Sequence, residues 1–164
     1  MEEQAVIPNT FVIERSYPVP RERVFAALSQ SEKKRRWYAE RDGHDVTGFT
    51  MDFRIGGESM LSYRLGPDTP FEGVEIVNEE QFHDIVPDRR IVSASTMSLG
   101  GRRFSVSLVT IELIATETGT DLVCIHQGVF FEGADGPEMR EAGWRALFDK
   151  LASALAGAEA YQPQ

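Results

Sequence analysis

The sequence predicts an α+β domain in which one long C-terminal helix lies on an antiparallel sheet of about six to seven strands. Near the C-terminus, residues 137–156 carry apolar side chains at helical spacing, namely Trp144, Leu147, Phe148, Leu151 and Leu155. Most of residues 10–131 instead alternates with the period of two that is typical of strands. Short turns join these alternating segments, which favours antiparallel pairing. Helices gathered on one face of such a sheet define the α+β class.

The first part of the chain predicts one strand and two short helices. Residues 10–17 alternate as a strand, and Pro18 and Pro20 end it. Residues 21–28 have their apolar side chains at helical spacing. A second short helix is predicted from Ser31, whose hydroxyl is suited to cap it, to Tyr38.

Six further strands are predicted between the short helices and the last helix. Their residue ranges are 49–53, 61–65, 71–82, 91–98, 104–115 and 121–131. Glycine-rich turns such as Gly56-Gly57 and Gly100-Gly101 separate them. The whole order is therefore strand, two short helices, six strands and one long helix.

The last helix has clear start and stop signals. Pro137 suits the first helical position, because proline lacks the N–H that would be left unbonded there. Glu138 and Glu141 place carboxylates near the positive end of the helix dipole, and Gly157 is suited to end the helix. A helix of this length runs roughly 30 Å and needs a broad surface under its apolar side.

Length and charge narrow the class of protein. The 164 residues suit a single domain, 1–164, with a core at about 10–156 and flexible tails at 1–8 and 158–164. The net charge of -9 opposes binding to nucleic acid and to anionic membrane surfaces. No apolar run approaches the ~20 residues that span a bilayer, and the acidic N-terminus does not read as a signal peptide. Together with the single Cys124, these features predict a cytoplasmic protein.

Five short segments, in their order and spacing, resemble a known family. They are Pro20–Leu28, Arg36-Trp37-Tyr38, Asp52–Gly57, Gly119–Leu122, and Gly143-Trp144 followed by Leu147 and Leu151. This combination resembles the family related to the C-terminal domain of the activator of the 90-kDa heat-shock-protein ATPase. That family belongs to the START and birch-pollen-allergen superfamily, also called SRPBCC. The resemblance covers about residues 10–156 and implies a helix-grip fold, with a curved sheet and a C-terminal helix enclosing a cavity.

The resemblance leaves three functions open, because one fold serves many functions. The first is a module that binds a small hydrophobic or amphipathic ligand in a cavity of roughly 300–1,000 Å³. The second is an enzyme of the polyketide-cyclase or hydrolase kind that acts in the same cavity. The third is a cofactor of the 90-kDa chaperone ATPase, or another protein-interaction module, as a monomer or homodimer.

The predicted cavity is lined by aromatic, sulfur-containing and a few polar side chains. The candidates are Trp37, Met51, Phe53, Tyr63, Phe71, His126, Arg140, Trp144, Leu147 and Phe148. Tyr63 and Trp144 are favoured, because each has one polar group on an apolar body.

His126, Arg140 and Tyr63 are the candidates for acid–base or orienting roles. His126 shares a strand face with apolar residues, which fits either a ligand-binding histidine or a core histidine bonded to the backbone. Arg140 precedes Trp144 by one helical turn, so it either clamps an anion at the cavity mouth or extends to water.

Two further features have competing interpretations. Cys124 and His126 share a strand face but supply only two ligands, so no metal site is predicted. No phosphate-binding or dinucleotide-binding motif is present, so no cofactor is predicted either. The basic run Lys33-Lys34-Arg35-Arg36 is either an anion-steering or docking patch or the solvated side of a short helix.

Overall fold

The computed structural model describes residues 6–40 and 43–160 and contains seven strands and four helical segments in that part of the chain. The N-terminal elements are β1 (Val6–Tyr17), α1 (Arg21–Ser29), α2 (Ser31–Lys34) and the short π-helix η1 (Arg35–Ala39). The remaining strands are β2 (Asp45–Met51), β3 (Glu58–Arg64), β4 (Glu75–Val86), β5 (Arg90–Leu99), β6 (Arg102–Ala115) and β7 (Thr120–Phe131). The long helix α3 (Pro137–Ala160) ends the described chain.

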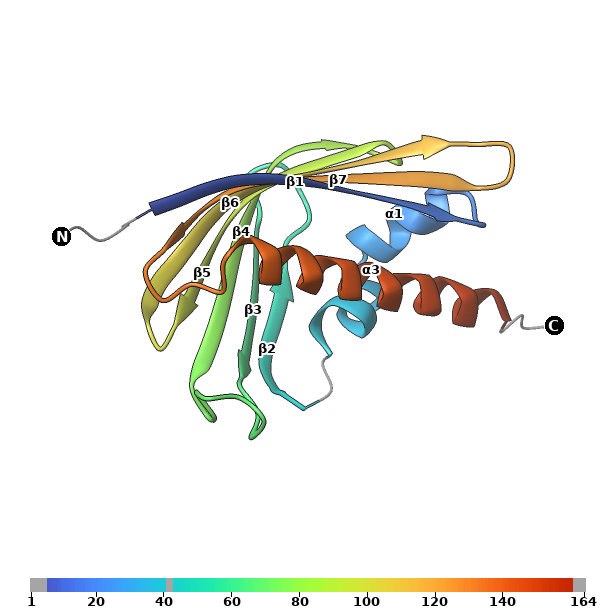
Figure 1. Ribbon diagram of the computed structural model, residues 1–164. Coiled ribbons are helices and arrows are strands. Elements are labelled where there is room, and N and C mark those ends of the chain that lie inside the picture. Colours follow the sequence, from blue (N-terminus) through green and yellow to red (C-terminus); the bar gives the residue numbers. More distant parts are fainter. Residues whose placement is uncertain (1–5, 41–42, 161–164) are drawn as a thin grey trace.

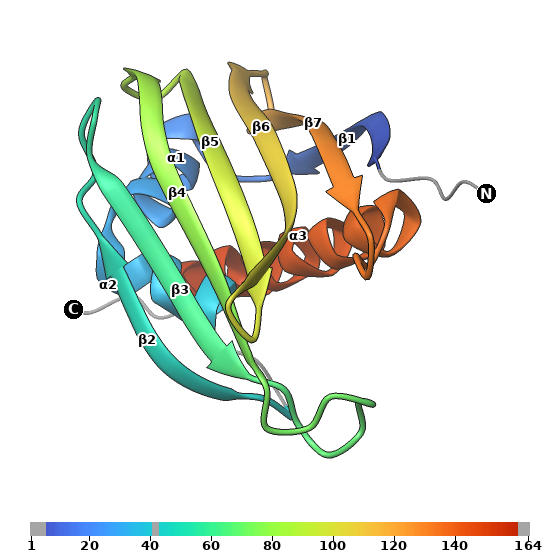
Figure 2. The ribbon, with the colours of Figure 1, turned by 90° about the vertical axis from the view of Figure 1, so that its left-hand side faces the viewer.

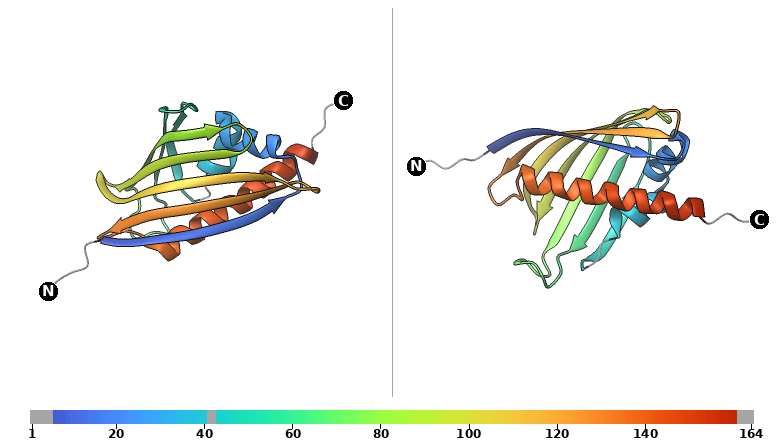
Figure 3. Two further views of the ribbon diagram at one scale, coloured as in Figure 1. Left: turned by 90° about the horizontal axis from the view of Figure 1, so that it is seen from above. Right: turned by 45° about the vertical axis from the view of Figure 1, so that its right-hand side comes forward.

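All seven strands form one antiparallel sheet in the order β1-β7-β6-β5-β4-β3-β2. The sheet curves, and α3 lies across its concave side together with the short helices (Figure 1, Figure 3). In the view turned by 90°, the strands stand in front of α3 (Figure 2). The predicted α+β class and the helix-grip arrangement are therefore confirmed.

The ends of the first strand and the last helix extend further than predicted. Strand β1 begins at Val6, so residues 6–8 of the predicted tail pair with β7. Helix α3 continues to Ala160, although Gly157 was expected to end it. Residues 1–5 and 161–164 of the predicted tails lie outside the described residues.

The prediction of a strand from Phe71 was wrong, because the chain is still turning there. The amide of Gly73 donates to the carbonyl of Leu65, and Gly73 has a positive φ of 82°, which glycine adopts without strain. Strand β4 starts only at Glu75. Phe71 is consequently 51% exposed.

The second short helix begins as predicted, but Ser31 is not its cap. Ser31 is already the first helical residue, and no side chain caps the helix. After Lys34 the backbone widens into the π-helical turn η1, which buries Trp37 and Tyr38. The indole N–H of Trp37 donates to the carbonyl of Ala27 at 2.9 Å, and this bond fixes η1 against α1.

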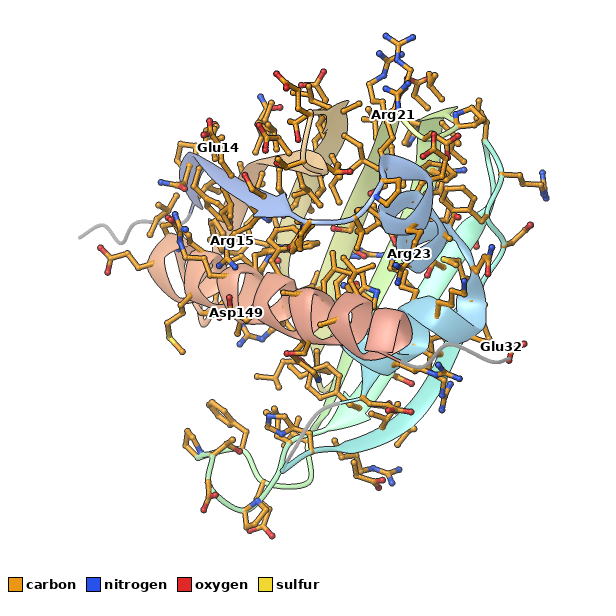
Figure 4. All side chains as sticks on the ribbon, turned by 90° about the vertical axis from the view of Figure 1, so that its right-hand side faces the viewer. Glu14, Arg15, Arg21, Arg23, Glu32 and Asp149 are labelled. Atoms are coloured by element: carbon orange, nitrogen blue, oxygen red, sulfur yellow. The ribbon has the colours of Figure 1, made fainter. Side chains whose placement is uncertain are left out.

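Polar contacts along β1 and α1 fix the position of α3. The Tyr17 hydroxyl donates to the backbone carbonyl of Phe148 at 3.1 Å. Arg15 bonds Asp149 at 2.6 Å, and Arg23 on α1 donates to the carbonyl of Leu155; Figure 4 labels Arg15, Asp149 and Arg23 around the helix. These contacts hold the middle and the C-terminal half of α3 against β1 and α1.

Candidate functional site

Two adjacent pockets between α3, η1 and strands β3 to β6 share part of their walls, and we call them the outer and inner lobes of one cavity. The outer lobe has a volume of about 150 Å³ and is lined by Tyr38, Tyr63, Asn78, Met97, Asp135, Met139, Arg140, Gly143, Trp144 and Leu147. The inner lobe has a volume of about 30 Å³, and its walls include Lys34, Trp37, Glu80, Phe82, Ser93, Ser95 and Ile111. Tyr38, Asn78 and Trp144 line both lobes, and we call this shared wall the neck. The outer lobe is smaller than the volume expected from the sequence.

Arg140 on the first turns of α3 is paired inside the protein. Its Nε and Nη2 donate to the two carboxylate oxygens of Asp135 at 2.8 and 2.9 Å, and Nη2 also donates to Ser105 at 2.8 Å. The guanidinium lies 4.9 Å from the ring centre of Phe130. Arg140 is buried, so it does not extend to water, and Asp135 already neutralises its charge.

Lys34 and Glu80 form a second ion pair, in the inner lobe. The ammonium of Lys34 lies 3.8 Å from the Glu80 carboxylate and 4.6 Å from the ring centre of Tyr38. Glu80 also accepts a hydrogen bond of 2.6 Å from Ser93. The interpretation of the basic run as a solvated helix side is therefore wrong for Lys34. A signal was present in the sequence, since Lys34 precedes the buried Trp37 and Tyr38 by three and four residues.

Asn78 occupies the neck and has one polar atom without a partner. Its Nδ2 donates to the hydroxyl of Tyr38 at 2.8 Å. Its Oδ1 is buried and has no hydrogen-bond partner among the described residues. A buried carbonyl without a donor costs about 1–3 kcal/mol, so this atom is a ready site for a hydrogen bond from another molecule.

Asn78 and Glu80 were not predicted as site residues, although strand alternation carries a signal for both. Ile76, Asn78, Glu80 and Phe82 alternate along β4 and share the face that contacts the core. Across the sheet, Glu80 pairs with Ser95, and Ser95 pairs with Ser107. This register brings a polar row onto the concave face, which no single segment reveals.

The structure places five of the ten predicted cavity residues on the cavity walls. Trp37 lines the inner lobe, and the outer lobe receives Tyr63, Arg140, Trp144 and Leu147, with Trp144 reaching both.

The other five line neither lobe. They are Met51, Phe53, Phe71, His126 and Phe148. Phe53 instead packs against Phe25 and Phe82, with ring centres 5.7 and 4.9 Å away, and Phe148 is fully buried in the core. Met51 also packs against the core.

His126 is a core residue rather than a cavity residue. It is only 1% exposed, and its ring stacks on Phe11 at 4.6 Å between ring centres. Its Nδ1 has no hydrogen-bond partner among the described residues. Burial, with a smaller effect from the positive charge of Arg140, lowers the pKa of His126 to about 4. Of the three predicted acid–base candidates, only Tyr63 and Arg140 therefore meet in one cavity.

The low pKa of His126 predicts a loss of stability in mild acid. In the unfolded chain, this histidine binds a proton once the pH falls below its ordinary pKa of about 6.5. In the folded protein, it binds a proton only once the pH falls to about 4. The contribution of neutral His126 to the free energy of unfolding is therefore fully present above pH 6.5. It falls by about 1.4 kcal/mol per pH unit as the pH drops toward 4.

Urea unfolding at pH 7 and pH 5 measures this effect. From pH 7 to pH 5, His126→Leu is expected to lose about 2 kcal/mol less than the native protein, because leucine does not titrate. Arg140 and Asp135 are the charged groups that act on His126, and both remain in the sequence of the variant. An equal loss in both proteins would contradict the assignment.

The exposed part of the basic run lines a separate open groove. Lys33 and Arg36 face Arg23 and Lys150 across a hollow of about 710 Å³, which also touches Leu155 on α3. Of the groove's lining side chains that the structure describes, none is acidic. Its role as an anion-steering or docking surface stays a prediction.

No group of three or more His, Cys, Asp and Glu side chains suited to a metal ion occurs in residues 6–40 and 43–160. Cys124 is fully buried, and burial raises the pKa of its thiol to about 12. Within the same residues, no helix is long and apolar enough to span a membrane.

Comparison with known proteins identifies one family. The family model described as Activator of Hsp90 ATPase homolog 1-like protein matches residues 18–156. An uncharacterized protein from Rhizobium leguminosarum shares 34% identity and a TM-score of 0.84, over 93% of this chain and 97% of that one. A protein from Rhizobium loti shares 40% identity and a TM-score of 0.82, over 92% of this chain and 99% of the other.

A more distant structure has the same fold. DynU16, a protein in the dynemicin biosynthetic locus, shares 15% identity and a TM-score of 0.62, over 90% of this chain and 47% of that one. Among curated proteins, no sequence matches this chain.

Proposed function

This chain belongs to the family of activator of Hsp90 ATPase homolog 1-like proteins. From that premise we propose that it binds a small amphipathic molecule in its two-lobed cavity. The observation that carries the proposal is the composition of the cavity walls. Trp144, Met97 and Leu147 supply apolar surface, while Asn78 and Tyr63 supply hydrogen-bonding groups. Small-molecule sites typically combine apolar walls with a few polar groups in this way.

The volume of the cavity limits the size of the ligand. An outer lobe of about 150 Å³ lies below the roughly 300–1,000 Å³ of sites for drug-sized ligands. Sterols and long fatty acids are therefore poor candidates, and a molecule with a single ring is favoured.

A variant that fills the outer lobe tests this proposal. Gly143 lines the lobe from α3, and a Cβ atom at this position would meet nothing within 4 Å beyond its two neighbouring residues and the backbone of its own helix. Gly143→Leu is expected to block ligand binding without loss of stability, because glycine is a poorer helix residue than leucine. The matched control is Ala146→Leu, since Ala146 is exposed on the same helix and lines neither lobe.

Native mass spectrometry of freshly purified protein identifies a bound molecule, and thermal unfolding measures its effect. At about 100 times its dissociation constant, the ligand should stabilise the native protein and Ala146→Leu by about 2.7 kcal/mol. Gly143→Leu should show no such gain. Equal stabilisation of both variants, or no single-ring ligand in a screen at millimolar concentration, would refute the proposed site.

A further inference from the structure

We infer, resting on the proposed function, that the cavity selects an uncharged single-ring ligand with a hydroxyl group and that the amide of Asn78 recognises this hydroxyl. Three features of the cavity support this inference independently: its volume, the balance of its charges and the unsatisfied amide at its neck.

The volumes of the two lobes suit one ring with a polar end. An apolar protein cavity of about 150 Å³ holds a benzene molecule, and the outer lobe has about this volume. The inner lobe, at about 30 Å³, is close to the volume of one water molecule. A ring in the outer lobe therefore brings one substituent to the neck, where Asn78 and Tyr38 lie.

The charges that line the cavity cancel within each lobe. Arg140 in the outer lobe makes two hydrogen bonds to Asp135, and Lys34 in the inner lobe pairs with Glu80. A carboxylate ligand would add an anion beside two carboxylates, and the described lining residues offer no unpaired cation to compensate it. Since an unpaired buried charge is strongly unfavourable, the cavity disfavours anions. This conclusion opposes the carboxylate clamp that the sequence predicted as one role of Arg140.

The neck offers a hydrogen bond that a hydroxyl group can complete. With Nδ2 bonded to Tyr38, the buried Oδ1 of Asn78 needs a donor. A hydroxyl donates to Oδ1, and it can equally accept from Nδ2 if the two similar ends of the amide are exchanged. A methyl group at the same place leaves the amide unsatisfied, so it binds less tightly.

Three probes of matched shape test the selectivity: 4-methylphenol, 1,4-dimethylbenzene and 4-methylbenzoate. Titration calorimetry at pH 7 compares a hydroxyl, a methyl and a carboxylate on the same ring. We expect 4-methylphenol to bind about tenfold more tightly than 1,4-dimethylbenzene, the effect of one net hydrogen bond. 4-Methylbenzoate should bind at least tenfold more weakly than 4-methylphenol.

Two variants separate the contributions of the amide and of the charge. Asn78→Leu keeps a similar side-chain volume but removes the amide. In this variant, 4-methylphenol and 1,4-dimethylbenzene should therefore bind with about equal affinity. Asp135→Asn leaves Arg140 without its carboxylate and should shift the affinity ratio at least tenfold toward 4-methylbenzoate.

The possible results distinguish this inference from the proposed function. Binding of 1,4-dimethylbenzene or 4-methylbenzoate as tightly as 4-methylphenol would overturn the selectivity and leave the binding function in place. Retention of the tenfold preference in Asn78→Leu would overturn the role of Asn78. If none of the three probes binds the native protein at millimolar concentration, both the proposed function and the inference fail.

Discussion

Replacing Phe148 by alanine is expected to lower the free energy of unfolding by about 3–5 kcal/mol, the usual range for a buried aromatic residue. Phe148 is completely buried on the side of α3 that faces the sheet, and its ring centre lies 5.6 Å from that of Trp144. Whole domains are stable by only about 5–15 kcal/mol, so this variant should fold marginally. Urea unfolding followed by circular dichroism measures the difference.

Two neighbours on α3 serve as controls for Phe148→Ala. Arg145 is exposed and forms an ion pair with Glu141 within the helix, so Arg145→Ala should change stability by less than about 0.5 kcal/mol. Trp144 is half-buried at the cavity neck, so Trp144→Ala should lie between the two variants. If Phe148→Ala were as harmless as Arg145→Ala, the orientation of the helix on the sheet would be wrong.

Removing the carboxylate of Glu80 should destabilise the fold by about 3 kcal/mol. Glu80→Ala leaves the buried ammonium of Lys34 without a counter-ion and the hydroxyl of Ser93 without its acceptor. Breaking one partner of a buried ion pair typically costs about 3–5 kcal/mol. The long separation of 3.8 Å places this pair at the lower end of that range.

A double variant and a neighbour identify the cause of this loss. Lys34→Met combined with Glu80→Leu removes both charges and is expected to be near neutral or stabilising, because an apolar pair avoids the desolvation of two ions. Glu79→Ala changes an exposed carboxylate one residue away and should have little effect. The ion-pair explanation is wrong if Glu80→Ala is as mild as Glu79→Ala, or if the double variant is as unstable as Glu80→Ala.

Local patterns in the sequence were sufficient to predict the architecture. Two patterns indicate which side chains face the core. One is the period-two alternation of residues 104–115 and 121–131, and the other is the apolar helical stripe from Trp144 to Leu155. Because short turns link the strands, antiparallel order followed directly. The prediction failed where a local signal was ambiguous, as at Phe71, whose aromatic side chain suggested a strand while Gly73 continued the turn.

Helical spacing also predicted part of the cavity wall. Arg140, Trp144 and Leu147 recur at intervals of three and four residues, so they share one side of α3 and reach the same lobe. The same spacing did not distinguish a cavity residue from a core residue. Phe148 lies one position further around the helix than Leu147, and it packs in the core.

Only the tertiary structure decided the chemistry of the site. Asn78 and Glu80 reach the concave face through the alternation of β4, but their partners Tyr38 and Lys34 come from a helical segment about forty residues earlier. Periodicity shows which face of an element a residue occupies, whereas the neighbour on the facing element depends on strand register and on how the helices pack on the sheet. Strand register decided that His126 stacks on Phe11, and the packing of the short helices on the sheet decided that Lys34 pairs with Glu80, since both contacts join distant segments.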